Sequence, residues 1–130
     1  MGGNKKEEEV KNIRKREVAA GQLLDHMRDV IAKAMPMIDS VIVGGDFNTN
    51  RDQPMFASEE TLSIIEKIGF HNCMAGLPLN ERVTHPANHG YPDATFDYLF
   101  TVGASVGRTT IVASDVSDHY PVTCEITLQH

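Results

Sequence analysis

The chain has no tryptophan, few aromatic residues and only two cysteines among its 130 residues. Cys73 and Cys124 lie far apart and show neither CxxC spacing nor the Cys/His spacing of a metal site. A disulfide scaffold or a structural zinc site needs more ligands at closer spacing. We therefore interpret both cysteines as small core residues and expect no zinc site.

Long apolar runs are also missing. No stretch approaches the ~20 apolar residues that cross a bilayer. The first residues, MGGNKKEEEVKNIRKRE, are charged where a signal peptide is apolar. The sequence therefore predicts a soluble chain without a membrane span, and it leaves the cellular compartment unknown.

Positive charge is in deficit, since 12 Lys and Arg residues face 18 Asp and Glu residues and the net charge is −6. Proteins that bind nucleic acid by broad neutralisation of its phosphates are usually basic. The charge balance argues against such a surface. It still allows a phosphate ester to bind through a divalent cation, because the ion inverts the local charge.

The composition that remains is that of a globular protein, with 41% hydrophobic and 23% charged residues in a length that suits one domain. Apolar residues recur at steps of three and four from Val10 to Ala34, which predicts a long amphipathic helix over about 7–35. Pro36 ends this pattern. A second helix is predicted at about 58–68.

Strand composition dominates the rest of the chain. The apolar, β-branched run 41–43 predicts a central strand that is buried on both faces. Segments 95–101, 108–113 and 122–128 predict further strands, after a loop over 77–93. The order of helix, strand, helix and then mostly strands indicates the α/β (α+β) class.

Polar side chains of possible catalytic use follow the first strand. Asp46 and Asn48 come directly after Gly44 and Gly45. Residues two apart in extended backbone point to the same side, so a carboxylate and an amide share one rim, while Phe47 points into the core. The segment is equally compatible with an ordinary polar turn.

Two later segments carry further polar groups. Asp97 lies inside the apolar segment TFDYLF, where an unpaired carboxylate is costly, so it needs a partner. The segment SDHYP supplies one in His119. Its neighbour Asp118 shares that site only if the segment is a loop, because adjacent residues of a strand face opposite ways. Alone, this segment is also compatible with a surface turn.

In this order and at this spacing, GGDFNT, TFDYLF and SDHYPV resemble the later motifs of the endonuclease/exonuclease/phosphatase superfamily, whose fold is that of deoxyribonuclease I. The match runs from about Arg16 to Leu128. The resemblance implies a metal-dependent phosphoesterase, a hydrolase of the nuclease and phosphodiesterase kind, built as a four-layer sandwich. Earlier motifs of the family, including a metal-binding Glu, have no counterpart here. Residues 1–130 are therefore expected to form a single partial unit, the carboxyl-terminal half, with one mixed β-sheet, a long amphipathic helix and a second helix.

The resemblance also implies a role for each polar residue. Asp46 orients and deprotonates the attacking water, and Asn48 hydrogen-bonds that water or a phosphoryl oxygen. Asp97 holds His119 and favours its imidazolium form. The charged His119 stabilises the phosphoryl group in the transition state. Asp118 binds Mg²⁺ or Mn²⁺ as the cofactor.

Three loop residues precede the TFDYLF segment, namely Arg82, Thr84 and His85. In the family fold, this position lies near the rim of the active site, so the resemblance makes them candidate substrate contacts. The competing interpretation is that they are ordinary residues of an exposed loop.

Two functions of different class follow. In the first, the parent enzyme hydrolyses a phosphate ester by in-line attack of water, and this chain, with part of the site, is inactive or weak alone. In the second, the chain is a non-catalytic module whose uncovered sheet binds another chain, either the missing half or a second copy. The substrate stays open among nucleic acid, sugar phosphate, inositol phosphate and phospholipid.

Overall fold

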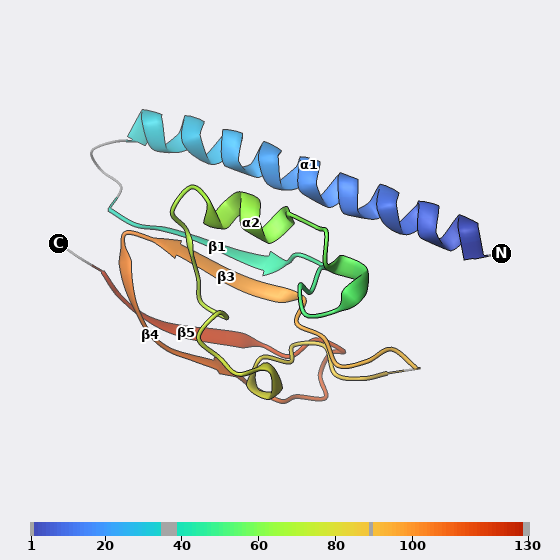
Figure 1. Cartoon of the computed structure of the whole chain (residues 1–130). Coiled ribbons are helices and arrows are strands. Elements are labelled where there is room, and N and C mark those ends of the chain that lie inside the picture. The colour runs from blue at the N-terminus through green and yellow to red at the C-terminus, as the bar shows by residue number, and fades with distance from the viewer. Residues whose placement is uncertain (1, 35–38, 89, 129–130) are drawn as a thin grey trace.

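The computed structural model describes residues 2–34, 39–88 and 90–128. Its helices are α1 (Gly2–Ala34) and α2 (Thr61–Glu66), and two short 3-10 helices span Pro54–Phe56 and Leu79–Glu81. Its strands are β1 (Val41–Asp46), β2 (His71–Asn72), β3 (Asp97–Val102), β4 (Ala104–Ile111) and β5 (Val122–Leu128). Figure 1 shows the helices above the strands, so the chain is an α+β protein.

The described strands form two antiparallel sheets. In the first, β3 lies between β1 and β2, and in the second, β4 pairs with β5. β5 contacts β3 and runs in the same direction, but no ladder joins them in the described part of the chain. The expected single mixed sheet is thus replaced by two sheets, because the chain turns at Gly103 from one into the other. Gly103 has φ +79°, and a Cβ there would collide with the carbonyl of Asp39.

The first strand differs from its prediction. We expected the run 41–43 to be a central strand buried on both faces, but β1 lies at the edge of its sheet. Val41 and Val43 pack against the core, whereas Ile42 is 51% exposed. The consecutive apolar residues predicted that both faces of β1 are buried. In the described part of the chain, other elements cover only the face of β1 that carries Val41 and Val43.

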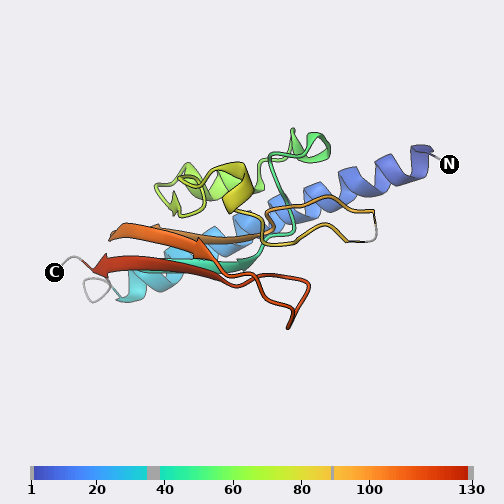
Figure 2. The same cartoon turned by 90° about the horizontal axis from the view of Figure 1, so that it is seen from below.

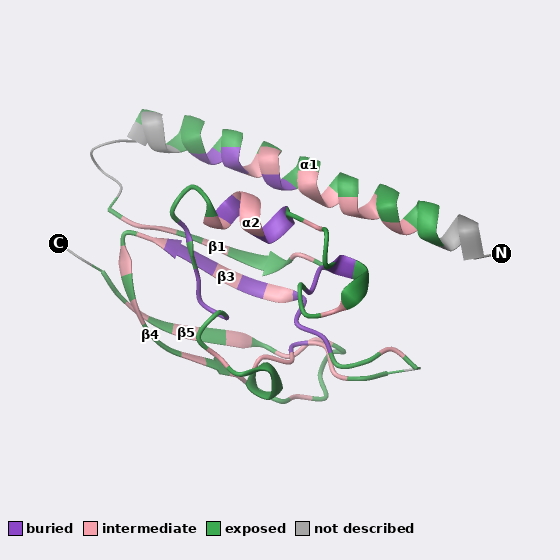
Figure 3. Ribbon diagram, viewed as in Figure 1, coloured by how far each residue is buried: buried purple, intermediate pink, exposed green. Residues whose placement is uncertain are grey.

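Two helices cover that buried face. Leu24 and Met27 of α1 and Ile65 of α2 pack with Tyr98 and Phe100 of β3. Figure 2, seen from below, shows the strands in front of α1. Figure 3 shows buried residues on β3 and on the facing sides of the two helices. Each such side chain contributes about 1.5–3 kcal/mol on burial, so this cluster is the main source of stability.

The long amphipathic helix is confirmed, since α1 runs to Ala34 where the pattern predicted 7–35. Residue 35 and Pro36 lie outside the described residues. The last strand has its predicted bounds, while β3 begins at Asp97 rather than 95 and β4 at Ala104 rather than 108. No helix among the described residues is both long enough and apolar enough to span a membrane.

The second helix is shorter than the predicted 58–68. Glu59 lies before its first residue, and its side chain is engaged with Arg16 and Thr61. Its carboxylate accepts two hydrogen bonds from Arg16 of α1, from Nη2 at 2.6 Å and from Nε at 3.0 Å. It also accepts the Thr61 hydroxyl at 2.6 Å. The Glu59 side chain is 1% exposed. This charge-assisted contact ties α1 to the start of α2.

Both cysteines are free thiols, with Cys73 buried and Cys124 half-buried. Burial raises the pKa of Cys73 to about 11. A thiol with that pKa stays protonated and unreactive near neutral pH. This agrees with the core role that the sequence indicated for Cys73.

Candidate functional site

The register of β1 on β3 places two carboxylates opposite each other. Asp46 and Asp97 are partners in the antiparallel ladder, so their side chains leave the same face of the sheet. Like charges at opposite positions destabilise a sheet. A cation between them removes this cost, and the chain provides one from a distant segment.

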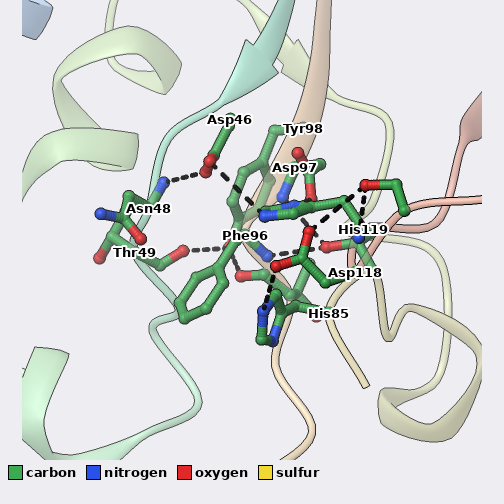
Figure 4. A network of polar contacts seen from close by, with 12 residues as sticks. Asp46, Asn48, Thr49, His85, Phe96, Asp97, Tyr98, Asp118 and His119 are labelled. Carbon is green, nitrogen blue, oxygen red and sulfur yellow. Dashed lines mark hydrogen bonds and ion pairs between the residues drawn. The ribbon is translucent and has the colours of Figure 1, made fainter. Parts of the chain in front are cut away.

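His119, from the loop before β5, is that cation when its ring is protonated. Its Nδ1 lies 2.7 Å from Asp97 Oδ2, and its Nε2 lies 3.9 Å from Asp46 Oδ2 (Figure 4). The expected contact between Asp97 and His119 is therefore present. The hydrogen bond to Asp97 raises the pKa of His119; partial burial opposes the rise, and the charges of the neighbouring carboxylates add to it. The imidazolium form is favoured.

Asp97→Asn is expected to lower the pKa of His119, because the amide keeps the shape of the side chain and removes its charge. In the wild-type chain, the raised pKa means that protonation of His119 stabilises the fold. This contribution is complete below the unfolded-state pKa and is lost as pH rises through the folded-state pKa. An NMR titration of the His119 ring measures the change, with the exposed His26 as internal reference. Equal His119 pKa values in both proteins would contradict the pairing.

The segment after β1 forms a sharp turn. Asp46 Oδ1 accepts the main-chain N–H of Asn48 at 2.8 Å, and Asn48 has φ 53°, in the left-handed region that Asn tolerates. The expected extended backbone through Asn48 is therefore wrong, because the side chain of Asp46 captures that N–H. Phe47 turns into the core as predicted, with its ring edge-on to Phe100 at 5.4 Å between centroids. Asp46 keeps Oδ2 free to face His119, and the Asn48 side chain is exposed.

The segment before β5 is a loop, so Asp118 and His119 share one site. Ser117, to which the sequence assigned no role, shapes it: its hydroxyl oxygen accepts the N–H of His119 at 3.2 Å and lies 3.3 Å from Asp118 Oδ1. The next residue, Tyr120, donates its N–H to the carbonyl of Thr84 at 2.6 Å. The Ser117 contacts thus shape the loop, and the Tyr120–Thr84 hydrogen bond holds it against the rest of the site.

His85 is the one of the three expected substrate contacts that reaches the cluster. Its Nε2 lies 4.0 Å from Asp118 Oδ2, and its ring centroid lies 5.0 Å from that of His119. Figure 4 shows the rings of His85 and His119 on either side of Asp118. The sequence placed His85 near the rim without indicating which groups it meets.

The side chains of Thr84 and Arg82 are engaged in contacts within the chain. Thr84 is 0% exposed, and its hydroxyl accepts the N–H groups of Phe96 at 2.9 Å and Asp97 at 3.2 Å. Thr84 is therefore buried in this structure instead of facing a substrate, and its hydroxyl helps to position Asp97. The guanidinium of Arg82 donates to Asp52 Oδ2 at 2.6 Å and is committed to that ion pair.

In the described part of the chain, two groups of side chains offer ligand atoms to a metal ion. One comprises Asp46, Asp97 and His119, and the other comprises His85, Asp118 and His119. Within each group the ligand atoms lie within 4.8 Å of one another. Carboxylates suit Mg²⁺ and Mn²⁺, whereas imidazoles suit transition metals.

Comparison of the chain with protein-family models, with curated proteins and with solved structures finds no match. The resemblance to the endonuclease/exonuclease/phosphatase superfamily therefore rests on the three motifs alone.

Proposed function

We propose that this chain carries part of the active site of a metal-dependent phosphoesterase of the endonuclease/exonuclease/phosphatase superfamily. The supporting observation is His119, tied through Nδ1 to Asp97 and facing Asp46 with Nε2 at 3.9 Å. That separation is too long for a direct hydrogen bond. An oxygen beside the two groups, from water or from a phosphoryl group, can bond to both.

Each residue then has a separate task. Asp46 takes a proton from the attacking water through Oδ2, because Oδ1 already accepts the N–H of Asn48. His119, held by Asp97, donates from Nε2 to a phosphoryl oxygen and stabilises negative charge in the transition state. The exposed amide of Asn48 is a further donor to the phosphoryl group. The water oxygen bonds to phosphorus in line with the ester oxygen, whose bond to phosphorus breaks.

Asp118 is the carboxylate that suits Mg²⁺ or Mn²⁺. Its side chain is 67% exposed, and it lies beside His119 on the same loop. Hard oxygen ligands fit these ions, and Mg²⁺ keeps several of its waters when bound. Such an ion supplies charge stabilisation to the phosphate. The net charge of −6 favours small phosphate esters over long nucleic acids as substrates.

Excess Mg²⁺ is expected to raise the melting midpoint of the chain, because a ligand that binds only the folded state stabilises it. Asp118→Asn removes the ligand and is expected to abolish the shift. Asp25→Asn, on α1 and with a side chain 80% exposed, is the matched control and keeps the shift. Thermal melting by circular dichroism measures all three proteins. An unchanged wild-type midpoint would count against the metal site.

The exposed side of the edge strand β1 supports both a finer fold proposal and a second candidate function. Ile42 and Asp46 are exposed on one side of β1, opposite the side that packs on the helices. We propose that a second sheet of a deoxyribonuclease I-like sandwich covers this face in the active enzyme. A chain that self-associates in sedimentation, yet neither responds to Mg²⁺ nor hydrolyses phosphate esters, would instead be a non-catalytic binding module.

A further inference from the structure

We propose that His85, Asp118 and His119 bind a transition-metal ion of the Zn²⁺ type, at a site that shares Asp118 with the proposed Mg²⁺ site and adds two imidazole ligands. Two imidazoles and one carboxylate are a donor set that Zn²⁺ accepts with a fourth position left open. Their ligand atoms lie within 4.8 Å of one another. This departs from the expectation of no zinc site, which rested on the spacing of the two cysteines.

The surroundings of His119 suit a metal ligand. Its Nδ1 is engaged with Asp97 Oδ2 at 2.7 Å, which leaves Nε2 as the nitrogen for an ion. A carboxylate that accepts the second N–H of a histidine is the usual support of a metal-bound imidazole, since it orients the ring and raises its basicity. Asp97 is in turn held by the Thr84 hydroxyl through its main-chain N–H.

His85 is also fixed in direction. Its ring packs against those of Phe96 and Tyr91, with centroids 5.5 Å and 6.3 Å away, and its Nε2 points to Asp118 Oδ2. Its Nδ1 is buried and has no hydrogen-bond partner among the described residues. When a metal ion binds Nε2, the ring proton lies on Nδ1. Because this buried N–H has no acceptor among the described residues, the affinity of His85 for the metal ion is lowered. We therefore expect an exchangeable ion and not a permanent structural one.

The ligand atoms have to move slightly closer together to bind one ion. Bonds of about 2.0–2.2 Å to a tetrahedral ion separate ligand atoms by about 3.3–3.5 Å. The His85 Nε2 to Asp118 Oδ2 distance of 4.0 Å is somewhat longer. The Asp118 side chain is 67% exposed on its loop, so a rotamer change brings its carboxylate inward. Zn²⁺ binding here does not require the proposed hydrolysis to occur, and the bound ion would compete with phosphate for His119 Nε2.

Calorimetric titration of the chain with Zn²⁺ tests the site, with the visible spectrum of bound Co²⁺ as a second reading. We expect one principal site that excess Mg²⁺ does not displace. His85→Gln and Asp118→Asn are each expected to weaken Zn²⁺ binding by at least about tenfold, and Asp97→Asn by about tenfold. His26→Gln and Asp25→Asn on α1 are the matched controls and leave affinity unchanged.

Wild-type affinity in His85→Gln and Asp118→Asn would overturn the proposal, because the ion would then be held elsewhere, for example by Asp46, Asp97 and His119. The absence of a titratable site would overturn it as well. The Asp118→Asn variant is expected to fold, because the Asp118 side chain is largely exposed. Circular dichroism checks the fold of each variant. Because the readout is binding, a chain that binds Zn²⁺ but hydrolyses nothing would support this site while contradicting the proposed function.

Discussion

His119→Ala is expected to lower the Mg²⁺-dependent hydrolysis of a chromogenic phosphodiester by roughly 10²–10⁴-fold, the usual contribution of a positioned acid or base. The substitution removes the donor that faces Asp46 across 3.9 Å and leaves Asp97 without its partner. The effect is expected in kcat, because the charge that His119 stabilises develops in the transition state. Under the proposed function the chain supplies only part of the site. Wild-type turnover is therefore expected to be low, and the assay uses a high protein concentration.

The control for this variant is His26→Ala, which removes an exposed histidine from α1. It is expected to hydrolyse the ester at the wild-type rate. The His119 side chain is 32% exposed, so its loss should leave the fold intact by circular dichroism. Equal rates for wild type and His119→Ala would contradict the proposed role, and rapid wild-type turnover would contradict the inference of a partial site.

Phe100→Ala is expected to destabilise the chain by about 3–5 kcal/mol, the range for an aromatic residue deleted from a core. Phe100 is 0% exposed at the centre of β3 and packs with residues of both helices. Single domains have only about 5–15 kcal/mol of total stability, so the variant is expected to lie near the unfolding threshold. Urea denaturation followed by circular dichroism measures the free energy of unfolding.

Val116→Ala is the control, because Val116 is 90% exposed and its loss is expected to change stability little. Phe100→Leu restores part of the volume and is expected to recover part of the stability. The same core supports the site, since Phe47 lies edge-on to Phe100 and precedes the turn residue Asn48. A loss below about 1 kcal/mol in Phe100→Ala would show that the cluster is not the main core.

Some of the site could be predicted because the relevant chemistry is local. A carboxylate inside the apolar strand around Asp97 had to find a partner, and His119 is its partner in the structure. At Asn48 the sequence left an extended rim and a polar turn equally open, and a single side-chain acceptor, Asp46 Oδ1, decides for the turn. The buried role of Thr84 was missed because nothing in a loop sequence shows which main-chain N–H groups will face a hydroxyl.

The sequence by itself determined the long helix, the three later strands and the three polar segments, because apolar periodicity and turn residues act over a few neighbouring positions. Only the tertiary structure decided that β1 lies at a sheet edge, that Asp46 stands opposite Asp97, and that His85 reaches Asp118. These contacts depend on strand register and on how loops pack. Such features arise from the whole chain folding together, so no single segment specifies them.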